Sequence, residues 1–225
     1  MPYESFAASI ADQRQRTYLD QAERHRQAQS LRPTSAPAWQ SFLRTALVRV
    51  RPIRPSDTGL LQEAFDRLSL ESRQFRFLFP KLQLSASELR YFTEIDHHDH
   101  EALVAVHRLD NRGLGVARYI RHRNDPQAAD VAVTVIDDWH GRGLGTHLVT
   151  RLMERARCEG VSRFTAMIAS DNSRARKLVY SVGSAPMLLG YDDGVAEYEI
   201  PLGPGVSRSA SPRFPRLMRA PCSCA

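Results

Sequence analysis

A glycine-rich turn at residues 140–146 carries the residues of this 225-residue chain that are best suited to ligand chemistry. Its sequence, HGRGLGT, places glycines at Gly141, Gly143 and Gly145. Glycine lets the backbone approach a ligand closely and adopt positive φ, and the first amides of a following helix point outward without partners. Arg142 adds a fixed positive charge. The turn is therefore predicted to bind a phosphate group.

The segments on either side of the turn would hold it in place. Residues 129–135 alternate branched valines with small residues, as expected for a β-strand. A helix is predicted from Leu144 to a stop at Gly160. Its apolar positions recur at helical spacing: they are Leu144, Leu148, Val149, Leu152, Met153 and Ala156.

Two common phosphate-binding motifs do not match this turn. A Walker A loop needs Gly-Lys-Ser/Thr, and the turn contains no lysine; a dinucleotide fingerprint needs Gly-x-Gly-x-x-Gly, and Thr146 stands where its last glycine would be. Residues 140–145 instead resemble the Gln/Arg-x-x-Gly-x-Gly/Ala signature of the GCN5-related N-acetyltransferases (GNAT), in which this turn binds the pyrophosphate of acetyl-CoA. A helix start that is glycine-rich by chance is the alternative.

Composition limits the other classes of function. The net charge is +6 and the pI about 9.6, and residues 203–225 hold four arginines and no acidic residue. No interleaving of aromatic and basic residues and no zinc spacing supports nucleic-acid binding, whereas a basic surface would steer a polyanion such as CoA. No apolar run is long enough for a membrane span or a signal peptide, so we expect a cytoplasmic protein with no membrane partner.

The order of predicted elements gives the fold class. Residues 1–47 form a polar, helix-favouring extension with a linker, residues 48–202 a folded domain, and residues 203–225 a disordered basic tail. Within the domain the order is β-α-α-α-β-β-β-α-β-α-β-β, with Ser85 and Glu88 as a capping box. This order predicts an α/β domain whose sheet is mostly antiparallel, with a parallel pair flanking the central helix.

The same order of elements is that of the GNAT family, and the resemblance covers residues 48–202. It implies a mixed, mostly antiparallel twisted sheet with flanking helices and a splayed parallel strand pair at the acetyl-CoA site. Three stretches within residues 53–120 resemble more narrowly the catalytic domain of bacterial protein lysine acetyltransferases: IRPSDTGLLQEAFDRLSLESRQFRFLFP, LRYFTEIDHHDHEALVAV and GVARYI. This resemblance implies acetyl-CoA as acyl donor, no metal, and a lysine side chain of a protein as acceptor.

The resemblance also assigns roles to individual residues. Strand backbone groups would bind the pantetheine arm, turn amides the pyrophosphate, and Asn172 would lie near the thiol end. Arg176 would reach a CoA phosphate, with a solvated basic helix face as its alternative. The cofactor residues so assigned are Val133, Thr134, Val135, His140, Gly141, Arg142, Gly143, Leu144, Gly145, Thr146, Asn172 and Arg176.

Acyl transfer to an amine needs a base to remove a proton from that amine. Asp130 stands where the lysine acetyltransferases carry a glutamate thought to act as general base, and its shorter side chain would call for a bridging water. A solvated carboxylate at a strand end is the alternative. Tyr180 lies one position after the tyrosine that many relatives use as general acid, so we do not assign it that role.

Two further segments are expected on the acceptor side. Residues 73–79 are rich in arginine and aromatic residues, and residues 97–100 lie in a polar loop whose histidines could alternatively bind a metal. Three functions stay open at this point. They are a protein lysine acetyltransferase, a small-molecule amine acetyltransferase, and a non-catalytic acyl-CoA-binding module.

Overall fold

The computed structural model describes residues 47–183 and 185–203. The predicted extension up to residue 46, the tail from residue 204 and Ser184 lie outside the described residues. The chain divides into two units between Gln40 and Ser41, and everything described here belongs to the second unit. The domain boundaries proposed from the sequence therefore stay predictions.

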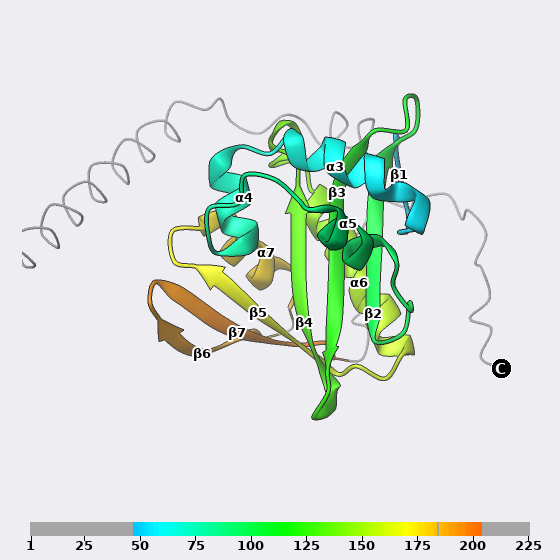
Figure 1. The fold of residues 1–225 in the computed structure, drawn as a ribbon. Coiled ribbons are helices and arrows are strands. Elements are labelled where there is room, and N and C mark those ends of the chain that lie inside the picture. The colour runs from blue at the N-terminus through cyan, green and yellow to red at the C-terminus, as the bar shows by residue number, and fades with distance from the viewer. Residues whose placement is uncertain (1–46, 184, 204–225) are drawn as a thin grey trace, which may run out of the picture. The chain divides into compact units, whose positions relative to one another are not determined.

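The described residues build one seven-stranded sheet in the order β1-β2-β3-β4-β5-β7-β6 (Figure 1). Each neighbouring pair is antiparallel except β4 and β5, which are parallel. This agrees with the predicted fold class. The strands are β1 (Val48–Pro52), β2 (His100–His107), β3 (Gly113–His122), β4 (Asp125–Val135), β5 (Arg163–Ala169), β6 (Met187–Asp192) and β7 (Val195–Pro201).

The parallel pair opens into a V. Strands β4 and β5 pair at only three positions, of which the last joins Asp130 to Thr165. Beyond Asp130 the two strands diverge (Figure 1), while β4 stays paired with β3 as far as Val135. One edge of β4 is therefore left without a strand partner over residues 131–135 in the described part of the chain.

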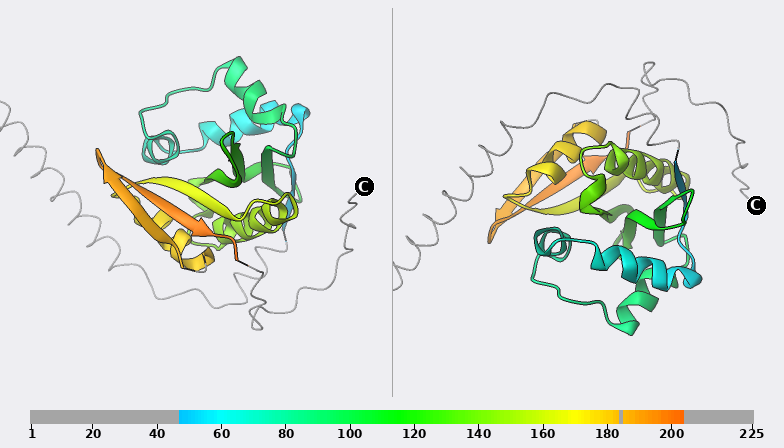
Figure 2. Two further views of the ribbon diagram at one scale, coloured as in Figure 1. Left: turned by 90° about the horizontal axis from the view of Figure 1, so that it is seen from below. Right: turned by 90° about the horizontal axis from the view of Figure 1, so that it is seen from above.

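Helices cover both faces of the sheet (Figure 2). Three lie on one face, and two lie on the other with the longest helix against β2, β3 and β4. The first three are α3 (Thr58–Asp66), α4 (Leu70–Phe77) and α5 (Ala86–Thr93), and the others are α6 (Leu144–Cys158) and α7 (Ser173–Val182). Short 3-10 turns precede α3 and α6: η1 (Pro55–Asp57) and η2 (Asp137–Trp139).

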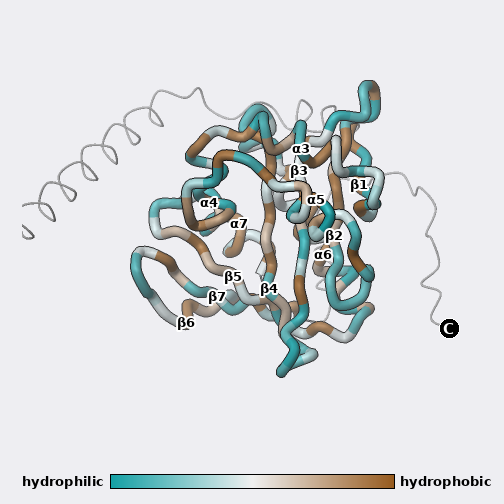
Figure 3. The backbone as a smooth tube through the Cα atoms, viewed as in Figure 1, coloured by the Kyte–Doolittle hydropathy of each residue, from teal (hydrophilic) through white to brown (hydrophobic). Residues whose placement is uncertain are grey.

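Alternation along β4 sends its side chains to both helical layers. Val131, Val133 and Val135 pack on the core formed with α6, whose Leu148 and Leu152 are fully buried. Ala132 and Thr134 lie between those valines, and their side chains line a cavity beneath α3–α5. Hydrophobic residues accordingly follow the central strands in Figure 3, whereas the β3–β4 hairpin is hydrophilic.

Most predicted boundaries agree with the structure, and one differs. Ser85 and Glu88 form the predicted capping box at the start of α5, and Gly160 follows the end of α6 with φ +80°. Strand β4, however, begins at Asp125, four residues before the predicted start at residue 129. Residues 125–128 lack an apolar alternation, and they lengthen the strand because the β3–β4 hairpin pairs His122 with Asp125.

Candidate functional site

The glycine-rich turn connects the open edge of β4 to helix α6. Gly141 and Gly143 have φ values of +69° and +78°, and a Cβ at either position would meet no atom within 4 Å. Positive φ costs an L-residue roughly 1–2 kcal/mol, so the backbone path requires glycine there. Gly145 is helical instead, and a Cβ there would contact Leu178 at 3.5 Å. The empty space beside Gly141 and Gly143 leaves the backbone accessible to a ligand.

The amides of this turn have no acceptor within the described residues. The first hydrogen bond at the start of α6 runs from His147 N to Gly143 O. The N–H groups of residues 141–146 therefore precede the helical ladder, as expected at a helix N-terminus. They lie at the positive end of a 15-residue helix, which suits a phosphate.

Two side chains brace the turn rather than extend into it. Nε2 of His140 lies 2.7 Å from Val135 O, which ties the turn back to the end of β4. The guanidinium of Arg142 stacks over the Trp139 ring at 5.1 Å from its centroid. The chemistry that this turn offers to an anion is therefore mainly that of its backbone.

The backbone groups of β4 alternate between its two edges. Ile136 N donates to Leu114 O on β3. The Thr134 carbonyl also faces β3, because a Cβ added to Gly115 would lie 2.7 Å from its oxygen. The backbone groups of Val133 and Val135 consequently point to the open edge. The part of Thr134 that faces a ligand space is its side chain, which lines the cavity beneath α3–α5.

Asp130 occupies the point at which β4 and β5 separate. Its carboxylate lies 2.9 Å from His122 Nε2 and also accepts a hydrogen bond from the Thr165 hydroxyl. The side chain is 69% exposed, whereas that of His122 is 35% exposed. Asp130 is therefore held by two neighbours and still open to solvent at the vertex of the V.

A carboxylate links the turn to the opposite helical layer. Asp137 accepts hydrogen bonds from Ser72 Oγ at 2.6 Å and Ser69 N at 2.7 Å, both at the start of α4. Burial alone would raise the pKa of Asp137, but these hydrogen bonds outweigh it and the pKa lies below its usual value. Helix α4 is thus fixed relative to the turn by a charged residue.

The cavity beneath α3–α5 has a volume of about 60 Å³. Apolar residues of the helices, the connecting segments and the strands form most of its wall, and Arg76, Arg118 and Thr134 are the polar residues that line it. Arg118 lies directly across from Ala132 in the β3–β4 ladder. Opposite residues in an antiparallel ladder share a face, so Arg118 is on the face that Asp130 also occupies, two residues before Ala132.

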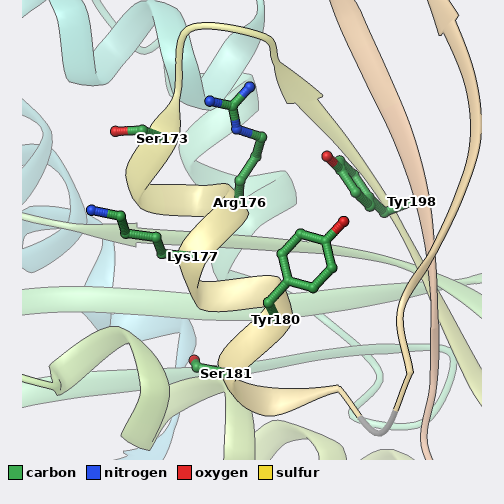
Figure 4. Close-up of a pocket in the computed structure, with 6 residues that line it drawn as sticks. All are labelled: Ser173, Arg176, Lys177, Tyr180, Ser181 and Tyr198. Atoms are coloured by element: carbon green, nitrogen blue, oxygen red, sulfur yellow. The ribbon is translucent and has the colours of Figure 1, made fainter.

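The two residues predicted at the start of α7 make hydrogen bonds within their own segment. Asn172 caps its own helix by accepting from Ala175 N at 3.0 Å, and Arg176 donates to Ser170 O at 2.6 Å. Arg176 faces an open groove of about 620 Å³ between α7 and β7 (Figure 4). Figure 4 also shows Tyr180 turned toward Tyr198 in this groove. The groove is lined by none of residues 140–146, and the role of Arg176 toward a CoA phosphate stays a prediction.

The histidines near the start of β2 each have a separate partner. Nδ1 of His97 lies 2.8 Å from Glu101, Nδ1 of His98 lies 2.7 Å from Glu159, and Nε2 of His100 lies 3.1 Å from Arg118. In the described ranges, no group of three or more His, Cys, Asp or Glu side chains converges as a metal site. His100 is the histidine of this loop that reaches an arginine of the cavity wall.

The residues of segment 73–79 have two different roles. The Arg73 guanidinium donates to the carbonyls of Leu68, Leu82 and Asp66 and so braces the ends of α3 and α4. Arg76 and Phe77 line the cavity instead. This segment therefore borders the cavity through residues of α4.

Sequence reasoning did not single out His122, Asp137 or Arg118. Each makes a contact that depends on strand register or helix packing. His122 bonds Asp130, Asp137 bonds the start of α4, and Arg118 lines the cavity. An isolated arginine in an apolar stretch, GVARYI, is the one local signal that pointed to a special environment.

Comparisons with known proteins identify the family that this chain resembles. The model of the acetyltransferase (GNAT) family matches residues 65–183. Acetyltransferase Pat of Mycolicibacterium smegmatis is 31% identical over 155 residues, which are 69% of this chain and 46% of that protein. An acetyltransferase of Pseudomonas aeruginosa is 31% identical over 138 residues, covering 60% of this chain and 74% of the relative. The chain thus spans about half the length of the Mycolicibacterium relative.

Solved structures show the same fold. The GNAT domain of S. lividans PAT superposes with a TM-score of 0.64 at 29% identity, covering 68% of this chain and 90% of that domain. YncA of Salmonella typhimurium, solved with its cofactor acetyl-CoA, gives a TM-score of 0.55 at 19% identity and covers 73% of this chain and 99% of that one. No helix within the described ranges is long and apolar enough to cross a membrane.

Proposed function

Because the chain belongs to the acetyltransferase (GNAT) family, we propose that it transfers an acetyl group from acetyl-CoA to a lysine side-chain amine of a protein. The observation that carries the proposal is the V between β4 and β5. Among the described residues, one edge of β4 has no strand partner from residue 131 onward, and the amides of residues 141–146, which have no acceptor there, lie beyond one end of that edge. Asp130 lies at the other end.

The residues of the turn fit the pyrophosphate of CoA. Open space beside Gly141 and Gly143 would admit phosphate oxygens next to the backbone, and the N-terminus of α6 favours negative charge. The free backbone groups of Val133 would pair with the pantetheine amides in the manner of an added strand. His140 would hold the end of β4 in position for this pairing.

Asp130 is then placed to receive the proton of the attacking amine. A lysine amine is almost wholly protonated at neutral pH, with a reference pKa near 10.4, so deprotonation must precede attack. The Asp130 carboxylate is solvent-accessible, and its bonds to His122 and Thr165 fix its orientation. The proton passes to this carboxylate directly or through one water. As the amine nitrogen bonds to the thioester carbon, the thioester oxygen would receive a hydrogen bond from an N–H at the open edge of β4. The carbon–sulfur bond then breaks, and CoA leaves as a thiol with the second proton of the attacking nitrogen.

The lysine acceptor is supported by the resemblance to bacterial protein lysine acetyltransferases and by the relatives named Pat. The experiment is incubation of the full chain with isotopically labelled acetyl-CoA and a library of lysine peptides, followed by mass spectrometry. We expect the label on lysine Nε atoms. Tight acetyl-CoA binding without label in any peptide, protein or small amine would instead identify a non-catalytic acyl-CoA-binding module.

A further inference from the structure

Two arginines face the cavity beneath α3–α5 without an acidic partner. The cavity is lined by 14 residues, of which Arg76 and Arg118 are the charged ones. Within residues 47–183 and 185–203, Arg76 makes no hydrogen bond or ion pair, and Arg118 bonds only neutral groups, the Phe92 carbonyl at 3.3 Å and Nε2 of His100 at 3.1 Å. An arginine enclosed in this way is normally paired with a carboxylate.

Aromatic rings position both guanidinium groups at this wall. Arg118 stacks on Phe92 at 4.4 Å from the ring centroid, and Arg76 lies 6.0 Å from the same ring and 5.0 Å from that of Phe77. Arg118 is only 5% exposed. Burial, and then the nearby charge of Arg76, lower the pKa of Arg118 to about 9, so the two cations repel one another. Cation–π contacts offset part of this cost, but they use the faces of the guanidinium planes and leave N–H donors unused.

The neighbouring histidine leaves the positive charge uncompensated. Burial, and then the charge of Arg118, lower the pKa of His100 to about 4, so its imidazole is neutral near pH 7. The Thr134 hydroxyl, which has no protein partner in the described ranges, adds a further donor on the β4 side. The polar side chains of the cavity are therefore all able to donate to one anion.

Size and position define what that anion can be. A water needs about 10–15 Å³ of such volume, so a cavity of about 60 Å³ admits a carboxylate with a methylene or two and excludes a polyphosphate. Arg118 is the diagonal neighbour of Asp130 on the same face of the β3–β4 pair, at a typical spacing of roughly 7–8 Å. The subsite thus adjoins the vertex where acyl group and amine would meet.

We propose that Arg76 and Arg118 form a carboxylate-binding subsite, which takes a carboxylate carried either on the acyl chain of the donor or on the acceptor beside its amine. This proposal rests on the proposed function for the identity of the two substrates. Planar guanidinium groups match a carboxylate through paired hydrogen bonds, so the subsite would select substrates by a charge that plain acetyl-CoA lacks.

Matched substrate pairs test the proposal and separate its two sources. For the donor, calorimetry compares succinyl-CoA with butyryl-CoA, which have the same four-carbon chain with and without the carboxylate. For the acceptor, calorimetry on the CoA-saturated chain compares a lysine peptide that has glutamate next to the lysine with the same peptide that has glutamine there. We expect the wild type to prefer the carboxylate in one of the two pairs by about 10- to 100-fold, as charge-assisted hydrogen bonds provide.

The ratio of the two affinities should fall to about one in Arg76→Met. It should fall only partly in Arg118→Lys, which keeps the charge but loses the planar geometry. Arg90→Met is the control, because Arg90 is exposed on neighbouring α5 and does not line the cavity. Melting temperatures report whether each variant folds. Equal binding within both pairs by the wild type, or a preference that survives in folded Arg76→Met, overturns the proposal. Because the readout is binding, it is independent of whether acetyl transfer occurs.

Discussion

The carboxylate of Asp130, midway along β4, and the imidazole of His122, at the end of β3, lie 2.9 Å apart between Oδ1 and Nε2. Asp130 is also the last residue of β4 that pairs with β5. The carboxylate proposed as general base is therefore oriented from β3 and β5 at the vertex of the V. A solvated carboxylate at a strand end would not require either contact.

This arrangement predicts the effect of removing the charge. Asp130→Asn keeps the side-chain size but cannot accept the amine proton, so turnover should fall by about 10²–10⁴-fold with little change in acetyl-CoA affinity. Asp125→Asn is the control, because Asp125 lies on the same strand and pairs with Arg163 rather than with the vertex. Steady-state kinetics and calorimetry measure the two quantities.

His122→Ala should lower turnover less than Asp130→Asn, since we assign His122 the positioning of the carboxylate. The pH dependence of kcat separates this role from a purely structural one. If His122→Ala is the more damaging change and Asp130→Asn keeps nearly full activity, the imidazole is the base and our assignment is wrong.

The proposed role of the turn predicts that alanine substitution at two glycines of similar conformation affects CoA binding differently. Gly143 and Gly160 flank α6 with φ values of +78° and +80°, and neither Cβ position has a neighbour within 4 Å. Alanine at either site should cost about 1 kcal/mol of stability from backbone strain. Only Gly143→Ala should also weaken CoA binding, because it displaces amides that would bind phosphate. Equal CoA affinity of the two folded variants in calorimetry would remove the turn from the cofactor site.

A second pair of variants tests the link between the turn and α4. Asp137→Ala removes hydrogen bonds to Ser72 and Ser69 and should lower the free energy of unfolding by about 1.5–3 kcal/mol. Asp138→Ala should cost less than about 1 kcal/mol, since Asp138 is 79% exposed and its ion pair with Arg67 spans 3.6 Å.

The contribution of Asp137 should depend on pH with a definite sign. Its pKa is lowered in the folded state, so the stabilisation is complete above the unfolded value near 3.9 and is lost as pH falls through the folded pKa. Denaturant titrations at several pH values should show the difference between wild type and Asp137→Ala narrowing only below about pH 4. A difference that narrows between pH 6 and pH 8 would contradict this account.

The proposed domain boundaries lead to a prediction for a shortened chain. Residues 1–30 and 203–225 lack the apolar periodicity that would bury them, so a 31–202 fragment should keep the melting temperature and turnover of the full chain. Parallel thermal melts and kinetics measure this. A large loss of turnover in the fragment would show that one of the removed segments closes the site or presents the substrate.

Local patterns predicted the framework of the site well. Valines at alternate positions, the glycine-rich turn and the apolar stripe of α6 identified β4, the turn and the helix, because each depends on residues close in sequence. The parallel pair followed from the order of elements. The roles of individual residues in cofactor binding stay predictions.

Contacts that depend on register could not be predicted in this way. His122 reaches Asp130 through a hairpin that begins in polar residues, and Arg76 and Arg118 approach one ring from segments that are far apart in the chain. The contacts of Thr134 and Asn172 likewise depend on details that a motif does not contain. The carbonyl of Thr134 faces β3, and the Asn172 side chain caps its own helix.

The central claim, acetyl transfer to protein lysines, is tested most directly by one comparison of kcat/KM. A folded protein bearing the best lysine site from the peptide library is assayed against free lysine and a polyamine, all with acetyl-CoA. We predict a much higher kcat/KM for the protein, because contacts beyond the amine orient it at Asp130. Small amines that react as well as any protein would contradict the claim and identify a small-molecule amine acetyltransferase.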